Sequence, residues 1–580
     1  MSAAQLVGWD RLAASAGPPP HCPFGGPARA ALAGPTLILL AAFAPAFAAP
    51  PKLTSLFPAG GQRSQAVSVM ATGDLSTWPV QAWSDRPGLT VTAEKDKGKF
   101  KIEIAANALP GTYWLRLHNA DGASVLRPFI VGTLAEVAES ETNDLPDKPQ
   151  MVEPQVVING KLAKSGDVDG YRVELKQGQT LVASLVANTT LGAPLDAALQ
   201  VCELVEHGRT EAFVVAQNHD AIGLDPLVAF TSQHDGAYLV RLFAIPAMPD
   251  SSVRFAGGED YLYRLTLTTG PFIDHALPLA AGNAETTVQF GGWNLAEIRS
   301  TIVPPLTADA DPLTPPDGAL AWAWHRDAAG AMLLPRMTNT MGGCLETAGA
   351  VHTHPFPASK NQKIRIRVAA KALGFPTDAV IAVLDAAGKV LAEADDSGRD
   401  DRDPTLDFTP SEDGQYAVRI RDLARRGGVR MCYRLTIEPV TPEFSLSLAT
   451  DSFVLEKGKP LEISVNVAAR DGFKEPIEIT AIGLPPGVTA EPLKFEPSGN
   501  APPPSSGGGR RGKGSKGGNQ GGGGPAAKLI LKADADAKVG GAAIRIEGRA
   551  GGEKPLIRSA RFSLNLPLAG QHHAAWLTVK

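Results

Sequence analysis

The sequence predicts an all-β protein built from several β-sandwiches in tandem. Short segments in which apolar and polar residues alternate recur along the chain, such as KFKIEIAA at 99 and AYLVRLFA at 237, and glycine, proline, asparagine and aspartate separate them. The chain contains 60 glycines and 48 prolines, which suits many turns. Its 580 residues exceed the roughly 250 that one hydrophobic core can organise, so several domains are expected.

Residues 1–48 have the order of a secretory leader. Arg29 precedes an apolar stretch at 37–43, and Ala46 and Ala48 then offer the small residues of a cleavage site. We therefore expect an exported protein that is secreted, periplasmic or held at the cell surface. The alternative is an uncleaved membrane anchor, but a glycine and two prolines interrupt the segment, and no integral membrane span is expected once the leader is removed.

The charge and cysteine content exclude two classes of protein. The formal net charge is only -5, and basic residues cluster only in one Gly/Ser/Pro-rich segment, so no nucleic-acid partner is expected. Beyond the leader the cysteines are Cys202, Cys344 and Cys432, too few for a disulfide scaffold. One pair can form and one thiol must remain; the sequence does not say which.

An internal repeat organises the middle of the chain. DPLVAFTSQHDGAYLVRL at 225 aligns without a gap to DPTLDFTPSEDGQYAVRI at 403. Upstream, LGAPLDAALQV at 191 matches LGFPTDAVIAV at 373. Downstream, YRLTL at 263 matches YRLTI at 433. Three matched segments in the same order indicate a duplicated domain.

The repeat and the breaks between strand-like segments suggest a division into domains. A weaker likeness between residues near 57 and near 277 suggests that an immunoglobulin-like sandwich precedes each repeat, and a third type of sandwich ends the chain. The expected parts are a leader at 1–48, an immunoglobulin-like sandwich at 50–133, the first repeat at 134–270, a small immunoglobulin-like module at 271–340, the second repeat at 341–440, and a C-terminal immunoglobulin-like sandwich at 443–580 with a low-complexity loop at 498–525.

Acidic residues gather where the first repeat begins, in AESETND at 138 and SGDVDGY at 165. In an extended segment alternate residues project to one side, so these side chains would crowd together and repel one another unless a cation joined them. Calcium accepts six to eight oxygen ligands. A solvated acidic linker with turn-forming aspartates is the alternative. The candidate ligands are Glu139, Glu141, Asn143, Asp144, Asp167 and Asp169.

The same stretch resembles a known family. With E-x-E-x-N-D, GDVDGY, LKQGQTL, PLDAALQV and DGAYLVRL in order, residues 139–269 resemble the bacterial pre-peptidase C-terminal (PPC) domain, and 341–439 looks like a degenerate copy. The resemblance implies jelly-roll-like β-sandwiches, similar to the collagen-binding domains of clostridial collagenases, in which an acidic linker strand and the aspartates of the next loop chelate calcium. The second copy reads GAVHTHPFPASKNQ where the first reads GDVDGYRVELKQGQ, so no equivalent site is expected there.

Motifs for catalysis are missing from the sequence. Neither HExxH nor G-x-S-x-G occurs, and the histidines, including His352 and His354, complete no zinc set at the usual spacing. We therefore expect a protein that is not an enzyme: an exported binding, adhesion or scaffold protein with structural calcium, whose ligand is an extracellular polysaccharide or protein. The alternative is an accessory or targeting subunit of an exported hydrolase or peptidase, or a hydrolase whose catalytic groups are not recognisable.

Overall fold

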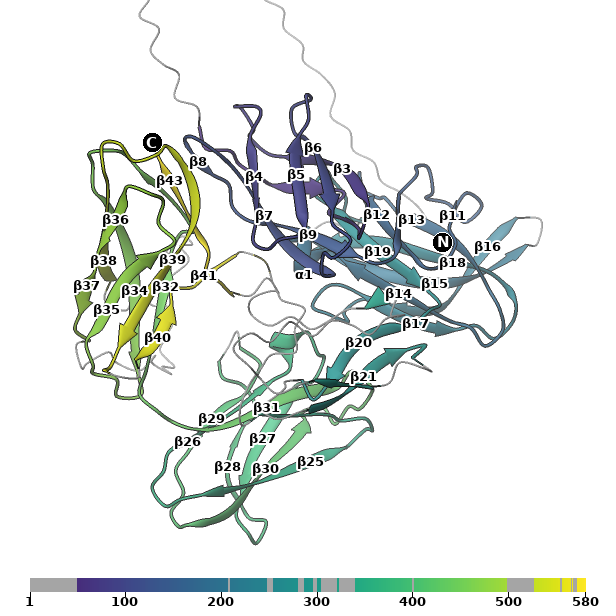
Figure 1. Cartoon of the computed structure of the whole chain (residues 1–580). Coiled ribbons are helices and arrows are strands. Elements are labelled where there is room, and N and C mark those ends of the chain that lie inside the picture. Colours follow the sequence, from purple (N-terminus) through teal and green to yellow (C-terminus); the bar gives the residue numbers. More distant parts are fainter. Residues whose placement is uncertain are drawn as a thin grey trace, which may run out of the picture. The chain divides into compact units, whose positions relative to one another are not determined.

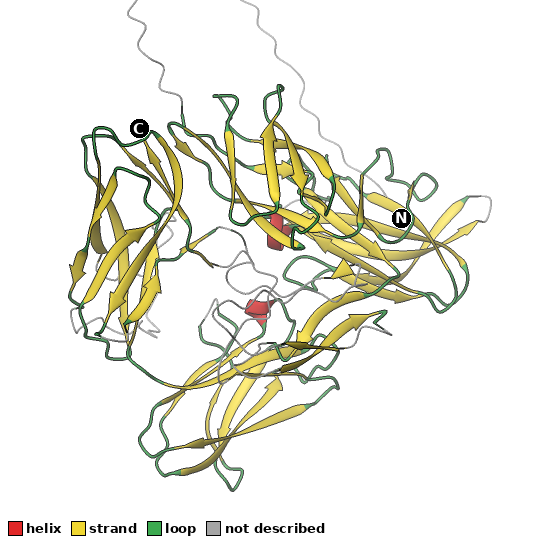
Figure 2. Ribbon diagram, in the orientation of Figure 1, coloured by secondary structure: helices red, strands yellow, loops and turns green. Residues whose placement is uncertain are grey.

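In a computed structural model of the protein, strands make up nearly all of the regular secondary structure (Figure 1; Figure 2). Helix in the described residues is limited to α1 (Asn188–Leu191) and the 3-10 turn η1 (Lys371–Leu373), and none of it is long and apolar enough to span a bilayer. The all-β prediction is therefore confirmed. The leader and the loop at 498–525 lie outside the described residues, which are 49–206, 209–247, 254–279, 286–295, 300–303, 321–322, 340–398, 401–497, 526–552, 555–564, 566 and 571–580.

The first sandwich lies between residues 55 and 132 and encloses a core of alternate strand residues such as Val69, Ile102 and Phe129. One sheet contains, in spatial order, β1 (Ser55–Phe57), β3 (Ala66–Thr72), β6 (Lys99–Ile104) and β5 (Leu89–Ala93). The other contains β2 (Gly60–Gln62), β9 (Arg127–Gly132), β7 (Gly111–Asn119) and β4 (Gln81–Ser84), with β8 (Gly122–Ala123) beside β7.

The first repeat forms two five-stranded sheets around a core that includes Tyr171, Leu199, Val240 and Leu265. One sheet contains β10 (Ala135–Ala138), β12 (Val156–Lys161), β19 (Leu262–Thr268), β14 (Thr180–Val186) and β17 (Leu227–Thr231). The other contains β11 (Gln150–Met151), β13 (Asp169–Leu175), β18 (Gly236–Pro246), β15 (Leu195–Glu206) and β16 (Thr210–Asn218). The short strands β10 and β11 both run parallel to their neighbours, and they flank the acidic segment.

The second repeat has the same strand order without those two short strands. One sheet contains β24 (Thr340–Cys344), β31 (Cys432–Pro439), β26 (Ile364–Ala369) and β29 (Thr405–Phe408). The other contains β25 (Val351–Ala358), β30 (Gly414–Asp422), β27 (Ala379–Leu384) and β28 (Val390–Ala394). Its described strands include no counterpart of β10 or β11, and the strands that the two copies share form an eight-stranded sandwich.

A buried aspartate holds the same turn in each repeat. Asp225 accepts hydrogen bonds from the backbone N–H groups of Ala187 at 3.1 Å and Asn188 at 2.8 Å, where α1 begins. Asp403 accepts from Ala370 at 3.0 Å and from the next two N–H groups, where η1 begins. Both turns end at a glycine in the left-handed conformation. The gapless alignment of the two copies thus has a structural cause: each aspartate is the partner of otherwise unpaired N–H groups.

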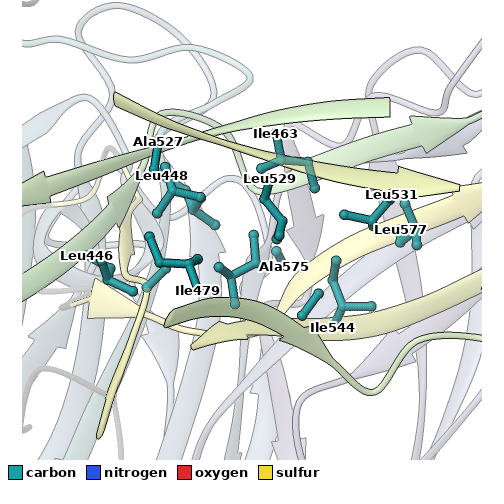
Figure 3. Packing of buried hydrophobic residues seen from close by; sticks show 14 of the residues in the cluster. Leu446, Leu448, Ile463, Ile479, Ala527, Leu529, Leu531, Ile544, Ala575 and Leu577 are labelled. Carbon is teal, nitrogen blue, oxygen red and sulfur yellow. The ribbon is translucent and has the colours of Figure 1, made fainter. Parts of the chain in front are cut away.

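Two further groups of strands complete the chain. One sheet contains β22 (Ser300–Val303), β21 (Thr286–Trp293), β20 (Phe272–Leu277) and β23 (Ala321–Trp322). The C-terminal sandwich packs leucine, isoleucine and alanine side chains between its sheets (Figure 3). One of its sheets contains β32 (Glu443–Leu448), β34 (Leu461–Arg470), β38 (Ala526–Ala533) and β36 (Val488–Glu491). The other contains β33 (Ser452–Leu455), β43 (Ala575–Val579), β39 (Gly540–Ala550), β35 (Ile477–Ile482) and β37 (Leu493–Phe495), with β40 (Leu556–Ser559) beside β39. The strands β41 (Phe562–Ser563) and β42 (Gln571–His572) form a separate pair.

Candidate metal centre

The acidic segment enters the first repeat along β10, and its first carboxylate is fixed there. Because β10 pairs with β12, the backbone N–H of Glu139 reaches the carbonyl of Asn159 at 2.9 Å. The side chain turns back over the same strand, and its Oε2 accepts a hydrogen bond from the N–H of Lys161 at 2.7 Å. One carboxylate oxygen is thereby held by the sheet, and the other, Oε1, is left without a hydrogen-bond partner.

Asp167 and Asp169 come from the turn that leads into β13 and are fully buried. Asp167 closes the turn, because its Oδ2 accepts from the N–H groups of Ala163 at 2.6 Å and Lys164 at 3.3 Å. Asp169 is the first residue of the strand, and its Oδ2 accepts from the hydroxyl of Tyr263 at 2.5 Å. Each aspartate therefore has a second carboxylate oxygen, Oδ1, that is buried without a hydrogen-bond partner.

Asn143 brings the second half of the acidic segment against the same turn. Its backbone carbonyl accepts a hydrogen bond from the N–H of Gly170 at 3.1 Å, and its side chain is 1% exposed. A Cβ at position 170 would lie 2.9 Å from this carbonyl oxygen, so a glycine is what allows the two segments to approach. Both polar atoms of the Asn143 side chain are buried without a hydrogen-bond partner.

The structure brings the five predicted carboxylates into one cluster, and Asn143 joins the same turn through its backbone carbonyl. Carboxylate oxygens of Glu139, Glu141 and Asp169 lie within 4.8 Å of one another, and so do those of Glu141, Asp144 and Asp167, so Glu141 joins the two groups. Among the described residues, six buried side-chain atoms of this cluster have no hydrogen-bond partner. Each such atom costs about 1–3 kcal/mol if nothing satisfies it. They are Glu139 Oε1, Asn143 Oδ1 and Nδ2, Asp144 Oδ1, Asp167 Oδ1 and Asp169 Oδ1.

Burial and mutual repulsion disfavour the ionised form of the carboxyl groups in this cluster. Burial, followed by the neighbouring Glu139 carboxylate, raises the pKa of Asp169 to about 10. Burial also raises the pKa of Glu139, and desolvation together with the charge of Asp167 raises the pKa of Glu141. Without a metal ion, a proton retained on Asp169 relieves part of this repulsion.

Among the described side chains, Lys164 is the cation that lies within ion-pair distance of these carboxylates. The Nζ of Lys164 lies 3.4 Å from Asp167 Oδ1 and 3.5 Å from Asp144 Oδ2, and the Lys164 side chain is 59% exposed. The charges of Asp167 and Asp144 raise the pKa of Lys164. A single exposed ammonium group faces five carboxylates, so the cluster retains a deficit of positive charge. Oxygen donors from two chain segments, in this number, fit a hard divalent cation such as calcium.

The second repeat has different residues at the matching positions. Strand register places His352 opposite Ile420 as Asp169 stands opposite Leu242, and His354 opposite Val418 as Tyr171 stands opposite Val240. Their side chains share one partner: His352 Nδ1 and His354 Nε2 lie 2.8 and 2.7 Å from the hydroxyl of Tyr433. In the first repeat the hydroxyl groups of Tyr171 and Tyr263 are hydrogen-bonded to each other in the corresponding place. Histidines and a tyrosine thus stand in the second repeat where the first has the acidic site.

Sequence reasoning missed Tyr263, Tyr171 and Lys164. Tyr263 lies 94 residues from Asp169, and only strand pairing brings them together. A signal was present in the repeat, since YRLTL and YRLTI keep the tyrosine in both copies. Reasoning from sequence spacing also found no partner for the histidines, whereas the structure places His275 beside a Cys344–Cys432 disulfide and leaves Cys202 as a buried free thiol.

Comparisons with known proteins give a likeness of fold only. No family model and no curated protein matches the chain. The pre-peptidase C-terminal domain of a collagenase from Bacillus anthracis is 16% identical, with all of that chain and 22% of this one covered at a TM-score of 0.16. SGBP-B of the Bacteroides ovatus mixed-linkage glucan utilization locus, in complex with a mixed-linkage heptasaccharide, is 9% identical over 68% of this chain and 77% of that one, with a TM-score of 0.14. The four N-terminal immunoglobulin domains of Dscam1 isoform 4.4 are 10% identical over 92% of this chain and 98% of that one, with a TM-score of 0.15.

Proposed function

We propose that this chain is an exported, non-catalytic binding or scaffold protein whose first repeat holds a structural calcium ion. The observation that carries the calcium assignment is the group of six buried side-chain atoms without hydrogen-bond partners, contributed by five of the six residues that the acidic pattern singles out. A purely solvated linker would expose these atoms to water, yet Asn143, Asp167 and Asp169 are buried. A cation satisfies the oxygens together.

The ion would serve to join two pieces of chain. Glu139, Glu141, Asn143 and Asp144 belong to the segment that leads into the sandwich, and Asp167 and Asp169 belong to the turn before β13. Bound calcium supplies positive charge that cancels the repulsion among the carboxylates. The protein residues do the positioning: β12 holds Glu139, the turn at 163–167 holds Asp167, and Tyr263 holds Asp169.

A protein ligand is favoured by one edge of the first repeat. β16 is the last strand of its sheet, and it exposes three consecutive large apolar residues, Phe213, Val214 and Val215, at 53%, 46% and 42%. An exposed apolar edge strand offers unpaired backbone groups and side-chain contacts to an added strand. We assign to this edge an extended segment of a partner protein; a polysaccharide ligand would need another surface.

Calorimetric titration of the metal-stripped chain with calcium tests the assignment. We expect one binding event per chain and a melting temperature that rises with free calcium. At a hundredfold excess of calcium over Kd, the free energy of unfolding should increase by about 2.7 kcal/mol. The Glu141→Ala, Asp167→Ala double variant should lose both effects. Glu174→Gln, which removes an exposed carboxylate further along β13, is the matched control and should behave as the unaltered chain. Unchanged heats in the double variant would refute the site.

The non-catalytic, ligand-binding part of the proposal needs its own measurement. The full chain should bind a protein from an array of extracellular matrix and cell-surface proteins, and Val214→Lys, placed in the middle of the exposed edge, should abolish that binding while the calcium titration stays unchanged. Exclusive binding to a glycan array would overturn the assignment of the β16 edge. Hydrolysis of peptide or glycan substrates by the purified chain would overturn the non-catalytic assignment.

A further inference from the structure

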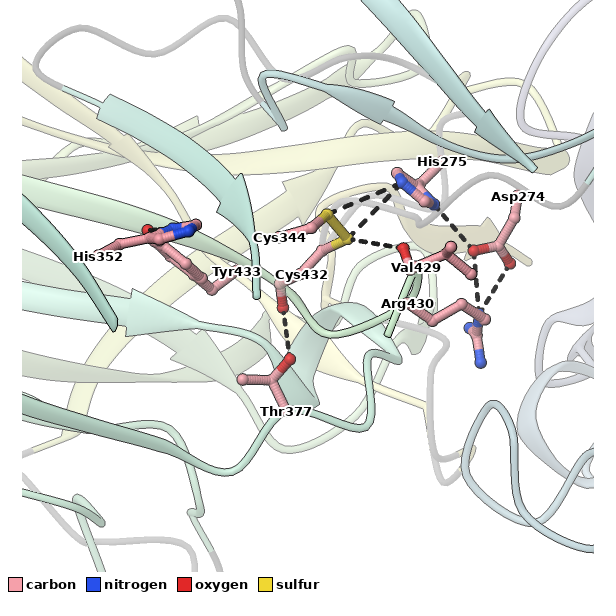
Figure 4. The surroundings of a disulfide bond; sticks show 9 residues. All are labelled: Asp274, His275, Cys344, His352, Thr377, Val429, Arg430, Cys432 and Tyr433. Carbon is pink, nitrogen blue, oxygen red and sulfur yellow. Dashed lines mark hydrogen bonds and ion pairs between the residues drawn. A yellow bond between two sulfur atoms is a disulfide. The ribbon is translucent and has the colours of Figure 1, made fainter. Parts of the chain in front are cut away.

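A second cluster of side chains that could hold a metal ion joins β20 to the second repeat. Cys344 on β24 and Cys432 on β31 are directly opposite each other in an antiparallel pair and form a disulfide. His275, from β20, lies against them (Figure 4). Leu277 and Leu279, which follow it, pack into the same hydrophobic core as the two cysteines, so the end of β20 is anchored there.

The chemistry of the imidazole is fixed by its neighbours. His275 Nδ1 lies 3.0 Å from Asp274 Oδ2, and the guanidinium Nε of Arg430 donates to both oxygens of that carboxylate, at 3.1 and 3.0 Å. Because an ionised carboxylate can only accept, the contact with Asp274 places a proton on Nδ1 and leaves Nε2 as the ring nitrogen that can bind a cation. Nε2 lies 3.8 Å from Cys344 Sγ and 3.6 Å from Cys432 Sγ.

The ring has little freedom to turn away. His275 is 3% exposed and stands opposite Gly291 on β21, where a Cβ would lie 2.1 Å from Nε2. Phe375 meets the ring edge-on, with centroids 5.8 Å apart. The two sulfurs and the nitrogen, all within 4.8 Å of one another, are therefore held in one buried place.

We propose that this cluster, in its dithiol state, is a binding site for a thiophilic d10 cation, Zn(II) or Cu(I). A dithiol reductant opens the disulfide: two electrons and two protons pass to Cys344 and Cys432, and the reductant leaves as its own disulfide. The cation then displaces both thiol protons, and two thiolates and His275 Nε2 become its ligands. Soft sulfur with imidazole nitrogen is the donor set that selects these ions over calcium or magnesium.

The surroundings match such a site in charge and in outer contacts. Two thiolates neutralise a divalent ion, and Asp274 is already neutralised by Arg430, so Zn(II) would leave no net charge in the buried cluster. A carboxylate on the far nitrogen of a ligating histidine is the usual outer partner in zinc sites. The disulfide and the ion exclude each other, because the sulfurs cannot be bonded to each other and act as two thiolate ligands.

Metal titration of the full chain under reducing, oxygen-free conditions tests this proposal. Reduced protein should bind one Zn(II), or one Cu(I) in a parallel titration against a Cu(I) chelator, and oxidised protein should bind neither at this cluster. X-ray absorption should find two sulfur ligands at about 2.3 Å and a nitrogen at about 2.0 Å around bound zinc. Binding should also protect Cys344 and Cys432, but not Cys202, from alkylation in the unaltered chain, a measurement that needs no variant to fold.

Variants separate ligands from neighbours. The Cys344→Ser, Cys432→Ser pair and His275→Gln should each lose the site, and Asp274→Asn, which acts through His275, should weaken affinity about 10–100-fold. Cys202→Ser, a buried cysteine outside the cluster, should bind as the unaltered chain. Reduced protein that binds neither ion, or absorption spectra without two sulfur ligands, would overturn the proposal.

Discussion

Raising the pH should destabilise the first repeat of the metal-free protein, and calcium should cancel the effect. The reason is the raised pKa of Asp169, about 10 in the folded chain against an ordinary value of 3.8. Between these two values the folded chain keeps a proton on Asp169 that the unfolded chain has released. The unfolded state then binds fewer protons, so the free energy of unfolding falls as the pH rises.

The size of the effect follows from the single proton involved. Stability should fall by about 1.4 kcal/mol per pH unit, or about 2.7 kcal/mol between pH 6 and pH 8. The loss begins near pH 4 and ends near pH 10, where Asp169 ionises in both states. For a sandwich of this size, about 4 °C per kcal/mol gives a decrease in Tm of about 10 °C over those two pH units.

Differential scanning calorimetry of chain freed of metal on a chelating resin checks this at pH 6, 7 and 8. The relevant transition is the one whose pH dependence disappears in Asp169→Asn, and Glu174→Gln serves as the control that should keep it. With saturating calcium, which displaces the proton, the same transition should become nearly independent of pH. A midpoint that stays flat or rises with pH in metal-free protein, or a slope that calcium leaves unchanged, would refute the retained proton on Asp169.

Other changes should act on the same cluster or on the repeat itself. Lys164→Gln should raise calcium affinity about fivefold in calorimetry, because the ammonium group competes with the ion for Asp144 and Asp167; unchanged or weaker binding would contradict this. Gly170→Ala should weaken calcium binding at least tenfold, because the new methyl group displaces the Asn143 carbonyl, whereas Gly414→Ala, which meets open space, should not; equal affinities would show that this approach is unimportant. Asp403→Ala should lower the free energy of unfolding by about 3 kcal/mol or more in denaturant titrations, since it leaves three backbone N–H groups unpaired.

Much of the fold was accessible from sequence because its determinants are local. Alternation of apolar and polar residues predicts strands, and segments such as KFKIEIAA at 99 do form one, with its apolar residues buried. The repeat was readable because the anchoring aspartates sit in the aligned DP dipeptides at 225 and 403. The acidic residues could be identified as a group because Glu139, Glu141, Asn143 and Asp144 are consecutive or alternate, with Asp167 and Asp169 only about 25 residues away.

The other contacts of the two clusters could not be predicted from the sequence, because they depend on the pairing of strands that are far apart in the chain. Tyr263 reaches Asp169 only because β19 lies in the sheet that faces β13, and no local pattern announces that partner. The three cysteines allowed any one pair, and the choice depends on the register that puts Cys344 opposite Cys432. His275 is separated from these cysteines by 69 and 157 positions, so a search for ligands at the spacing of zinc motifs could not connect them.

The two copies of the repeat illustrate how duplication divides labour within one architecture. Asp225 and Asp403 accept backbone hydrogen bonds at the same turn in both copies, whereas His352 stands in the second copy at the position that Asp169 has in the first. The framework is thus indifferent to the chemistry carried at that position. The ion site of the first copy could therefore be moved to the second by protein engineering. The change would replace 349–358 with 166–175 and add the acidic stretch that precedes the first copy.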